Sequence, residues 1–310
     1  MDFSSLVTLI GYLITGLVSG TLGGLIGIGG GVIVVPALTL IFGKDAQLAV
    51  AASLFQMIFV ATSSTYGHWK NRYIIRSVVV RLVPLATVCA VAGTIIGSSV
   101  GGATLLKVFA LFLVYTSADV GYKVAAGWLK GHPEEVPLTE YTPTNRWTIP
   151  AVAVPMGLAC GVLGIGGGSI AVPSLHKFLK LPLKNAIANS SAAIFFLSIV
   201  AAISKTLLIN GKTVTLFDGT YLTLHWYDVL IVGGLLAPTS FVGGRLGAHL
   251  ARRAPTRIIQ GIFILVMLYS ARDMWLKSEA KPKPPVVSPP AVEAPANPGS
   301  QAAQPTAPGD

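Results

Sequence analysis

Three long stretches of this chain carry no charged residue, and they constrain the fold more than any other feature. They are residues 3–28, 46–67 and 82–106. Each is longer than the roughly 20 residues that an α-helix needs to cross the hydrocarbon core of a bilayer. Only 11% of the 310 residues are charged, whereas a soluble domain has about 25%. The sequence therefore predicts an all-α, polytopic membrane protein.

The apolar pattern divides the chain into two halves of five segments each. We expect helices at residues 3–28, 31–43, 46–67, 78–100, 103–122, 148–165, 168–180, 185–209, 227–250 and 256–276. Segments 31–43 and 168–180 are too short to cross a bilayer alone, and they suit half-helices or re-entrant segments. No basic region precedes the first segment, so we interpret it as a retained helix and not as a cleavable signal.

The domain boundaries follow from changes in polarity. We predict a first transmembrane repeat (1–122), a polar cytoplasmic linker (123–147), a second transmembrane repeat (148–277) and a Pro/Ala-rich tail (278–310). The tail lacks apolar periodicity and is predicted to be disordered. Residues 210–226 are predicted to form a loop or hairpin outside the membrane.

The net charge of +10 is interpreted as a sign of topology, and no nucleic-acid partner is predicted. Most basic residues lie between apolar segments or near their ends, which is typical of the positive-inside bias. They include Lys70, Arg72, Arg76, Arg81, Lys177, Lys180, Lys184, Arg245, Arg252, Arg253 and Arg257. If each segment changes side, all of these and the linker can lie in the cytoplasm, and both chain ends then lie outside. An odd number of crossings in each half then predicts inverted repeats.

Few reactive side chains lie inside the apolar segments. Cys89 and Cys160 are interpreted as small buried hydrophobic residues, and neither a disulfide nor a metal site is predicted. Lys205 is the one cation within segment 185–209. Because it lies near the end of that segment, we expect its side chain to snorkel to the membrane surface.

One glycine-rich motif occurs twice. Residues 20–36 read GTLGGLIGIGGGVIVVP and residues 157–173 read GLACGVLGIGGGSIAVP; at an offset of 137 they share ten of seventeen positions. Three consecutive glycines, followed five residues later by a proline, interrupt a helix. The recurrence predicts a duplicated protein whose helices are broken, or re-entrant, at both GIGGG motifs.

Close helix packing explains only part of this glycine content. Small residues four apart let helices approach in lipid, and such pairs are Gly20/Gly24, Gly23/Gly27, Gly157/Gly161, Gly93/Gly97 and Gly243/Gly247. Packing does not explain three glycines in a row, each of which weakens a helix by roughly 1 kcal/mol relative to alanine. No lysine follows as in a P-loop, and no βαβ context supports a dinucleotide site.

A helix that begins at Val32 or Ser169 would expose its first amides, which favour anions. Two such breaks would meet near the bilayer midplane and form one anion site. Neutral polar residues of the third and eighth segments could line the same cavity, although hydrogen bonding between helices explains them equally well. The predicted substrate-binding residues are Gly29, Gly30, Gly31, Val32, Pro36, Ser53, Gln56, Gly166, Gly167, Gly168, Ser169, Pro173, Asn189 and Ser190.

The chain resembles the sulfite exporter TauE/SafE family of anion permeases. The resemblance is carried by residues 16–38 (GLVSGTLGGLIGIGGGVIVVPAL), 156–175 (MGLACGVLGIGGGSIAVPSL) and 243–253 (GGRLGAHLARR). It implies a multi-pass carrier of the bacterial inner membrane that moves sulfur-containing or organic anions. The proline-rich tail is not part of the family's usual pattern.

The leading hypothesis is therefore a secondary transporter that moves a small anion by alternating access. An anion channel and a non-transporting membrane partner subunit are the alternatives. No enzyme is predicted, because the segments lack paired acids, histidine clusters or a Ser/His/Asp set. No cofactor is expected, and homo-oligomerisation and the coupling ion are left open.

Overall fold

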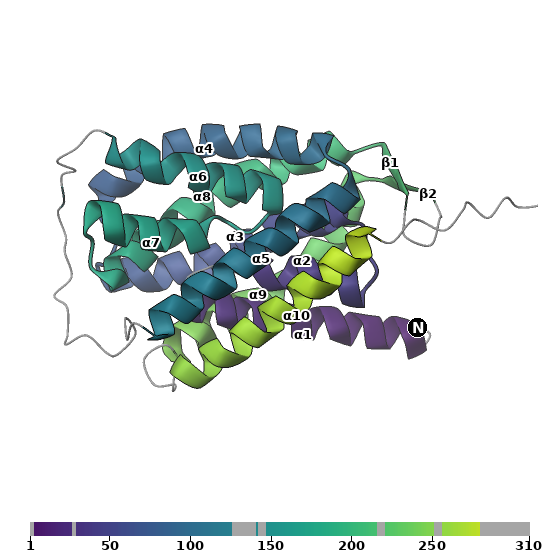
Figure 1. The fold of residues 1–310 in the computed structure, drawn as a ribbon, viewed down its shortest axis with the longest axis horizontal. Helices are drawn as coiled ribbons and strands as arrows, with labels where there is room; N and C mark the ends of the chain where they lie inside the picture. Colours follow the sequence, from purple (N-terminus) through teal and green to yellow (C-terminus); the bar gives the residue numbers. More distant parts are fainter. Residues whose placement is uncertain are drawn as a thin grey trace, which may run out of the picture.

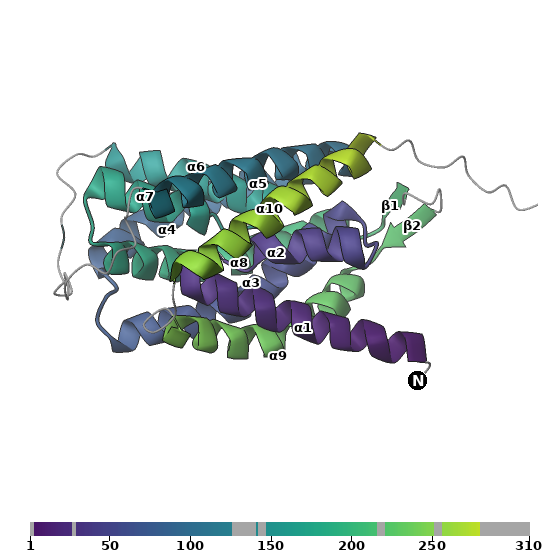
Figure 2. The ribbon, with the colours of Figure 1, turned by 60° about the horizontal axis from the view of Figure 1, so that its bottom comes forward.

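A computed structural model of the chain describes residues 3–26, 29–125, 141, 147–215, 221–250 and 256–279. Long helices lie along one axis of the molecule, and a small β-hairpin projects from one end (Figure 1). Helices α5 and α10 lie side by side and are inclined to the others (Figures 1 and 2).

The described residues form the ten predicted helical segments, if α2 and the π-helix η1 are taken together. The helices are α1 (Phe3–Ile26), α2 (Gly31–Pro36), η1 (Ala37–Ile41), α3 (Ala46–Lys70), α4 (Arg76–Ser99), α5 (Gly102–Ala125), α6 (Thr148–Leu163), α7 (Gly168–Leu179), α8 (Leu183–Ile209), α9 (Trp226–Leu250) and α10 (Thr256–Glu279). The predicted hairpin is confirmed, because β1 (Lys212–Thr215) pairs antiparallel with β2 (Tyr221–Leu224).

The predicted linker and tail fall mostly on residues that the structure does not describe. Helix α5 continues to Ala125, and residues 126–140 and 142–146 of the linker lie outside the described part. Helix α10 continues to Glu279, and residues 280–310 of the tail lie outside it as well.

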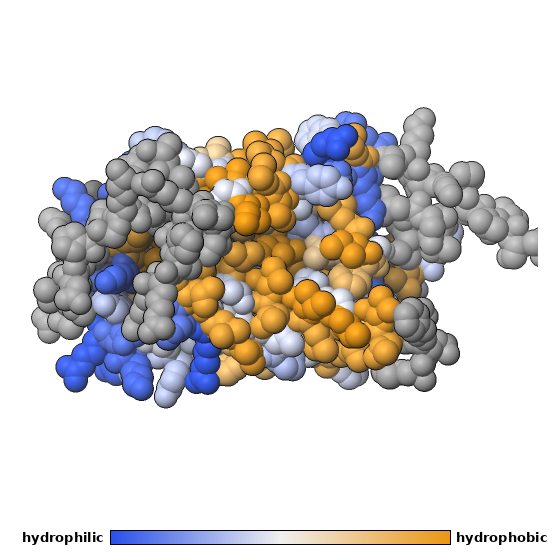
Figure 3. Space-filling view, turned by 90° about the horizontal axis from the view of Figure 1, so that it is seen from below, coloured by the Kyte–Doolittle hydropathy of each residue, from blue (hydrophilic) through white to orange (hydrophobic). Residues whose placement is uncertain are grey.

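Apolar residues cover the middle of the face shown in Figure 3. Within the described residues, 6 helices are long and apolar enough to cross a membrane. Side chains on the outside of the helices are apolar and exposed, as at Val80 (70%), Leu207 (71%) and Leu265 (68%). Such a surface is unfavourable in water but matches lipid tails. The prediction of an all-α polytopic membrane protein is confirmed.

Basic residues gather at the end of the molecule opposite the hairpin, which we call the basic end. The exposed members are Lys70, Arg72, Arg76, Lys177, Lys180, Lys184 and Arg245. Two loops are tied together there: Asn185 Nδ2 donates to the Tyr73 carbonyl at 2.8 Å, and the Ile75 amide donates to Asn189 Oδ1 at 3.0 Å. The loops predicted to share one membrane side therefore lie at one end of the fold.

The matching helices α3 and α8 run antiparallel. Near the basic end, Ser64 of α3 lies 3.2 Å from Ser191 of α8, measured between hydroxyl oxygens. At the other end of the same pair, Lys205 Nζ of α8 donates to Gln47 Oε1 of α3 at 2.5 Å. Two inverted repeats would produce this arrangement, and the inverted repeat itself stays a prediction.

The glycines four apart do pack helices closely, as predicted. A Cβ on Gly20 or Gly24 of α1 would overlap the carbonyl oxygen of Ser240 or Gly244 of α9, respectively. The counterpart pair in the other half uses Gly157 and Gly161 of α6 against α4. In each glycine-lined pair the two helices run parallel, and their backbones stay in contact over several turns.

Replacing Gly247 with alanine should destabilise the protein, because the new Cβ would overlap the carbonyl oxygen of Thr21. Overpacking of this kind costs about 1–3 kcal/mol. The matched control is Gly234→Ala on the same helix, where no atom lies within 4 Å of the added Cβ; alanine there should be neutral or gain up to about 1 kcal/mol. Thermal unfolding in detergent measures both, and equal midpoints would contradict the packing role.

Single cysteines at Asn71 and Lys184 should react with a membrane-impermeant thiol reagent from the same side of the membrane. A cysteine at Thr213 in the hairpin should react from the opposite side. The positive-inside rule predicts that the first two are cytoplasmic and therefore protected in intact cells. Labelling of positions 71 and 184 from opposite faces would refute the shared end.

Candidate functional site

Both glycine motifs interrupt a helix. In the first, α1 ends at Ile26 and α2 begins at Gly31, with Gly29 at a φ of +85°. In the second, α6 ends at Leu163 and α7 begins at Gly168. Both following helices begin where segments 31–43 and 168–180 were predicted to begin, one residue before Val32 and Ser169, so the last glycine of each triplet is already helical.

The second break depends on a left-handed backbone. Gly164, Gly166 and Gly167 have φ angles of +68°, +73° and +69°. Residues other than glycine rarely adopt these φ angles, because their Cβ atom comes too close to the backbone. A duplicated run of glycines therefore serves a conformational need that alanine cannot meet.

The two breaks touch each other in the interior. A Cβ on Gly31 would overlap the carbonyl oxygen of Gly164, and one on Gly29 would lie 3.1 Å from the carbonyl oxygen of Ile165. Helix α3 lies against both breaks: a Cβ on Gly166 would overlap Met57 Sδ, and Gly30 faces the Gln56 side chain. The structure thus brings together the predicted glycines of both halves.

Two predicted polar residues of α3 hold these breaks in place. Ser53 Oγ donates to the Gly164 carbonyl at 2.6 Å and so joins the two halves. Gln56 Nε2 donates to Ser19 Oγ at 3.1 Å and to Ser240 Oγ at 2.6 Å. Both hydroxyls in turn donate to the Gly16 carbonyl, so each must accept from Gln56. The amide nitrogen of Gln56 therefore has a bracing role.

Three predicted site residues carry a buried polar atom that has no hydrogen-bond partner in the described structure. They are Gln56 Oε1, Ser169 Oγ and Ser190 Oγ, and their residues are 0%, 3% and 0% exposed. Ser63 and Thr65 of α3 carry the other such atoms. An unsatisfied buried polar atom costs about 1–3 kcal/mol, so a cluster of them is typical of a functional site.

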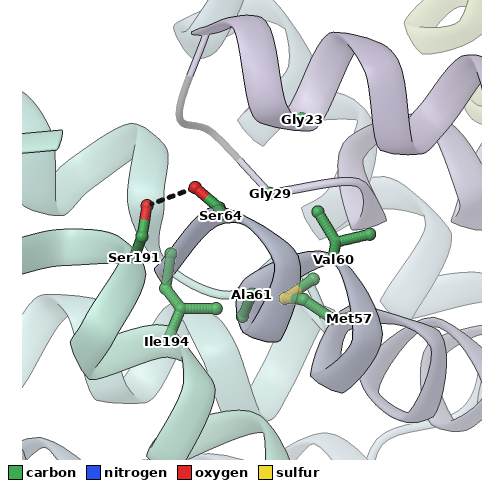
Figure 4. A pocket seen from close by; sticks show the side chains of 8 residues that line it. All are labelled: Gly23, Gly29, Met57, Val60, Ala61, Ser64, Ser191 and Ile194. Atoms are coloured by element: carbon green, nitrogen blue, oxygen red, sulfur yellow. Dashed lines mark hydrogen bonds between the residues drawn. The ribbon is translucent and has the colours of Figure 1, made fainter. Parts of the chain in front are cut away.

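A small cavity lies where the first break faces α3 and α8 (Figure 4). It is lined by Gly23, Gly29, Met57, Val60, Ala61, Ser64, Ser191 and Ile194. The volume open to the centre of a water-sized sphere is about 10 Å³, which is room for about one water. An oxyanion with several oxygens would need α3 and α8 to move apart.

Of these lining residues, the sequence prediction includes Gly29 alone. Helical periodicity could find two of the others, Met57 and Ser64, since they recur with Ser53 at the spacing of one helix face.

Some predicted residues do not reach the cavity. Asn189 has both polar atoms engaged: Oδ1 accepts from the Ile75 amide, and Nδ2 donates to the Asn185 carbonyl at 2.7 Å. It therefore braces the start of α4. Val32 is buried, Pro36 is followed directly by the π-helix η1, and Pro173 lies within α7. None of the four lines the cavity, and of all the predicted site residues only Gly29 does.

The prediction that Lys205 snorkels to the surface is wrong. Its side chain is 0% exposed, and Nζ donates to Gln47 Oε1 at 2.5 Å and to Ser98 Oγ at 3.0 Å. The ends of α3 and α4 offer it acceptors inside the fold, so the ammonium need not reach water. Nearby, Asp45 caps α3 through the Gln47 and Leu48 amides. Burial raises the pKa of the Asp45 carboxyl above its ordinary value, although these amide bonds oppose the shift.

Comparison with known proteins gives matches over most of the chain. A sequence model of the TauE family, described as sulfite exporter TauE/SafE, matches residues 12–274. The chain is similar to MamO of Magnetospirillum gryphiswaldense, a "probable membrane transporter protein", with 28% identity over 294 residues, or 87% of this chain and 45% of MamO. The chain thus spans about half the length of MamO.

Two further relatives match over nearly their whole length. YunE of Bacillus subtilis, also described as a probable membrane transporter protein, is 29% identical over 285 residues, or 83% of this chain and 93% of YunE. A probable membrane transporter protein of Xylella fastidiosa is 29% identical over 272 residues, or 86% of this chain and 94% of its own length. No solved structure matches the chain. Because the family match includes both glycine motifs and nearly every helix, the chain belongs to the sulfite exporter TauE/SafE family.

Proposed function

We propose that this protein is a secondary transporter of the cell inner membrane that moves a small, sulfur-containing or organic anion by alternating access. The family description and the names of the relatives support transport, and they give no support to an enzyme. The observation that carries the anion site is the set of unpartnered polar atoms on Gln56 and Ser169, which lie beside the two breaks, and on Ser190 of α8.

The chemistry of these groups suits an oxyanion. The hydroxyls of Ser169 and Ser190 are free to donate, and the first amides of α7 lack acceptors within their helix. The N-terminus of α7 also favours negative charge. Gln56 Oε1 can only accept, so it suits the O–H of a singly protonated oxyanion or of a bridging water. Neutral ligands bind an anion without trapping it, which turnover requires.

The proposed movement follows from where the site lies. The cavity lies between α3 and α8, and in this conformation it is too small for the substrate. Alternating access would open the α3–α8 interface first toward one end and then toward the other. An anion channel would use the same groups without closing on both sides.

Reconstituted liposomes should take up a radiolabelled anion from a panel that includes sulfite, sulfate and small organosulfonates. A carrier should show saturation and counterflow, because the site must reorient with each cycle. Ohmic single-channel current would instead favour the channel. A truncation that removes residues 278–310 serves as a control and should retain uptake; if no anion in the panel is transported, the proposed function fails.

Ser190→Ala should reduce transport at subsaturating substrate by about tenfold or more, since a hydrogen bond to a charged group contributes about 1.5–3 kcal/mol. The unfolding midpoint should stay the same or rise, because the lost hydroxyl has no partner. The matched control is Ser198→Ala on the same helix, a buried serine that bonds the Phe195 carbonyl at 3.1 Å. Its transport should stay within about twofold of the native protein. Equal effects of the two changes would contradict a substrate role for Ser190.

A further inference from the structure

Lys205 is a buried cation that the proposed binding site does not use. It lies on α8, the helix that carries Ser190 and Ser191, about four turns farther along toward the hairpin end. Both of its acceptors, Gln47 Oε1 and Ser98 Oγ, are neutral and belong to the first half of the chain. A charge placed there is costly to bury, which makes a purely passive role a poor explanation.

The contacts of Lys205 join three helices at the hairpin end. Gln47 lies in the first turn of α3, and its Nε2 donates to the carbonyls of Gly97 (2.9 Å) and Val100 (2.7 Å) at the end of α4. Lys212 of β1 donates to the carbonyl of Ser98, the residue whose hydroxyl holds Lys205. Unpaired carbonyls at a helix C-terminus attract cations, so the end of α4 stabilises both lysines.

This cluster closes the same interface that holds the cavity. Helices α3 and α8 carry the cavity residues Ser64 and Ser191 in the half toward the basic end. The Gln47–Lys205 bond spans the two helices at their opposite end. Any route from the hairpin end to the cavity along α3 and α8 must pass this bond.

We propose that Lys205, held by Gln47 and Ser98, is the gate at the hairpin end of the pathway between α3 and α8. This inference rests on the transport function proposed above. A cation suits such a gate, because an arriving anion competes for Nζ with two neutral acceptors, while the nearby Asp45 carboxylate is engaged as the cap of α3. Release of Nζ frees α8 from α3 and α4 at this end, while the bonds at the basic end stay in place.

The gate can be tested by the reactivity of a cysteine placed behind it. Ala202 is 3% exposed and lies one helical turn from Lys205 toward the cavity. In a full-length background with Cys89→Ala and Cys160→Ala, an impermeant thiol reagent is added to the face on which Thr213→Cys reacts. Lys205→Met should raise the labelling rate of Ala202→Cys by about tenfold or more, since a charge-assisted hydrogen bond is lost. Lys212→Met is the matched control, because it removes a neighbouring charge outside the α3–α8 interface, and it should leave the rate within about twofold.

A second variant should act in the opposite direction. Gln47→Glu would turn the neutral acceptor into a carboxylate and strengthen the bond to Lys205, but it would lose the two bonds that Nε2 donates to the Gly97 and Val100 carbonyls. Both the labelling rate of Ala202→Cys and transport should then fall, even if the unfolding midpoint also falls. If Gln47 were only a structural brace, the unfolding midpoint would change while labelling and transport stayed the same, which would overturn the gate.

Labelling and uptake separate this inference from the proposed function. An unchanged labelling rate in both Lys205→Met and Gln47→Glu overturns the gate, even if anions are transported. Labelling that responds as expected supports the gate even if the uptake panel finds no substrate, in which case the proposed function fails alone.

Discussion

Contact between the two helix breaks is the constraint on which the interior of this protein depends. The carbonyl of Gly164 lies against Gly31 and accepts the Ser53 hydroxyl, so one peptide group joins both glycine motifs and α3. Only glycine allows such an approach, because a Cβ at position 31 would overlap that oxygen. In lipid, irregular backbone must be satisfied by the protein itself. Each break therefore packs against the other half of the chain, and the second break also accepts a hydrogen bond from it.

Helices α3 and α8 act as a central antiparallel pair around this contact. Their polar residues are divided between bracing and binding. Gln56 illustrates the division within one side chain: its nitrogen holds α1 and α9, and its oxygen is left unpartnered. Ser53 and Ser190 illustrate it across the halves. They are partners at the offset of 137, but Ser53 is bonded and Ser190 is not. The duplicated sequence thus supports two different local arrangements in one conformation.

Most of the fold could be predicted from sequence, because lipid imposes a simple rule on where charge is allowed. The helix limits followed from uncharged segments, and the hairpin followed from the Asn210–Gly211 turn residues between two of them. The convergence of the glycine motifs followed from the duplication. The bonds of Asn189 and Lys205 could not be predicted for one shared reason: their partners, Ile75 and Gln47, lie more than a hundred residues away in the sequence. Apolar cavity residues such as Met57 lie on a helix face that periodicity can find, but their apolar character alone does not separate them from the core.

The glycine breaks also limit how a protein with this fold could change its substrate specificity. The breaks expose backbone groups to the interior, and the backbone has the same chemistry whichever residue it belongs to. Substitution there can only fill space or distort the backbone, so the breaks offer no adjustable chemistry. Selectivity between one anion and another has to come from the few side chains of α3, α7 and α8 that face the breaks. A change of preference would then require few mutations, on helices whose opposite faces keep the scaffold intact.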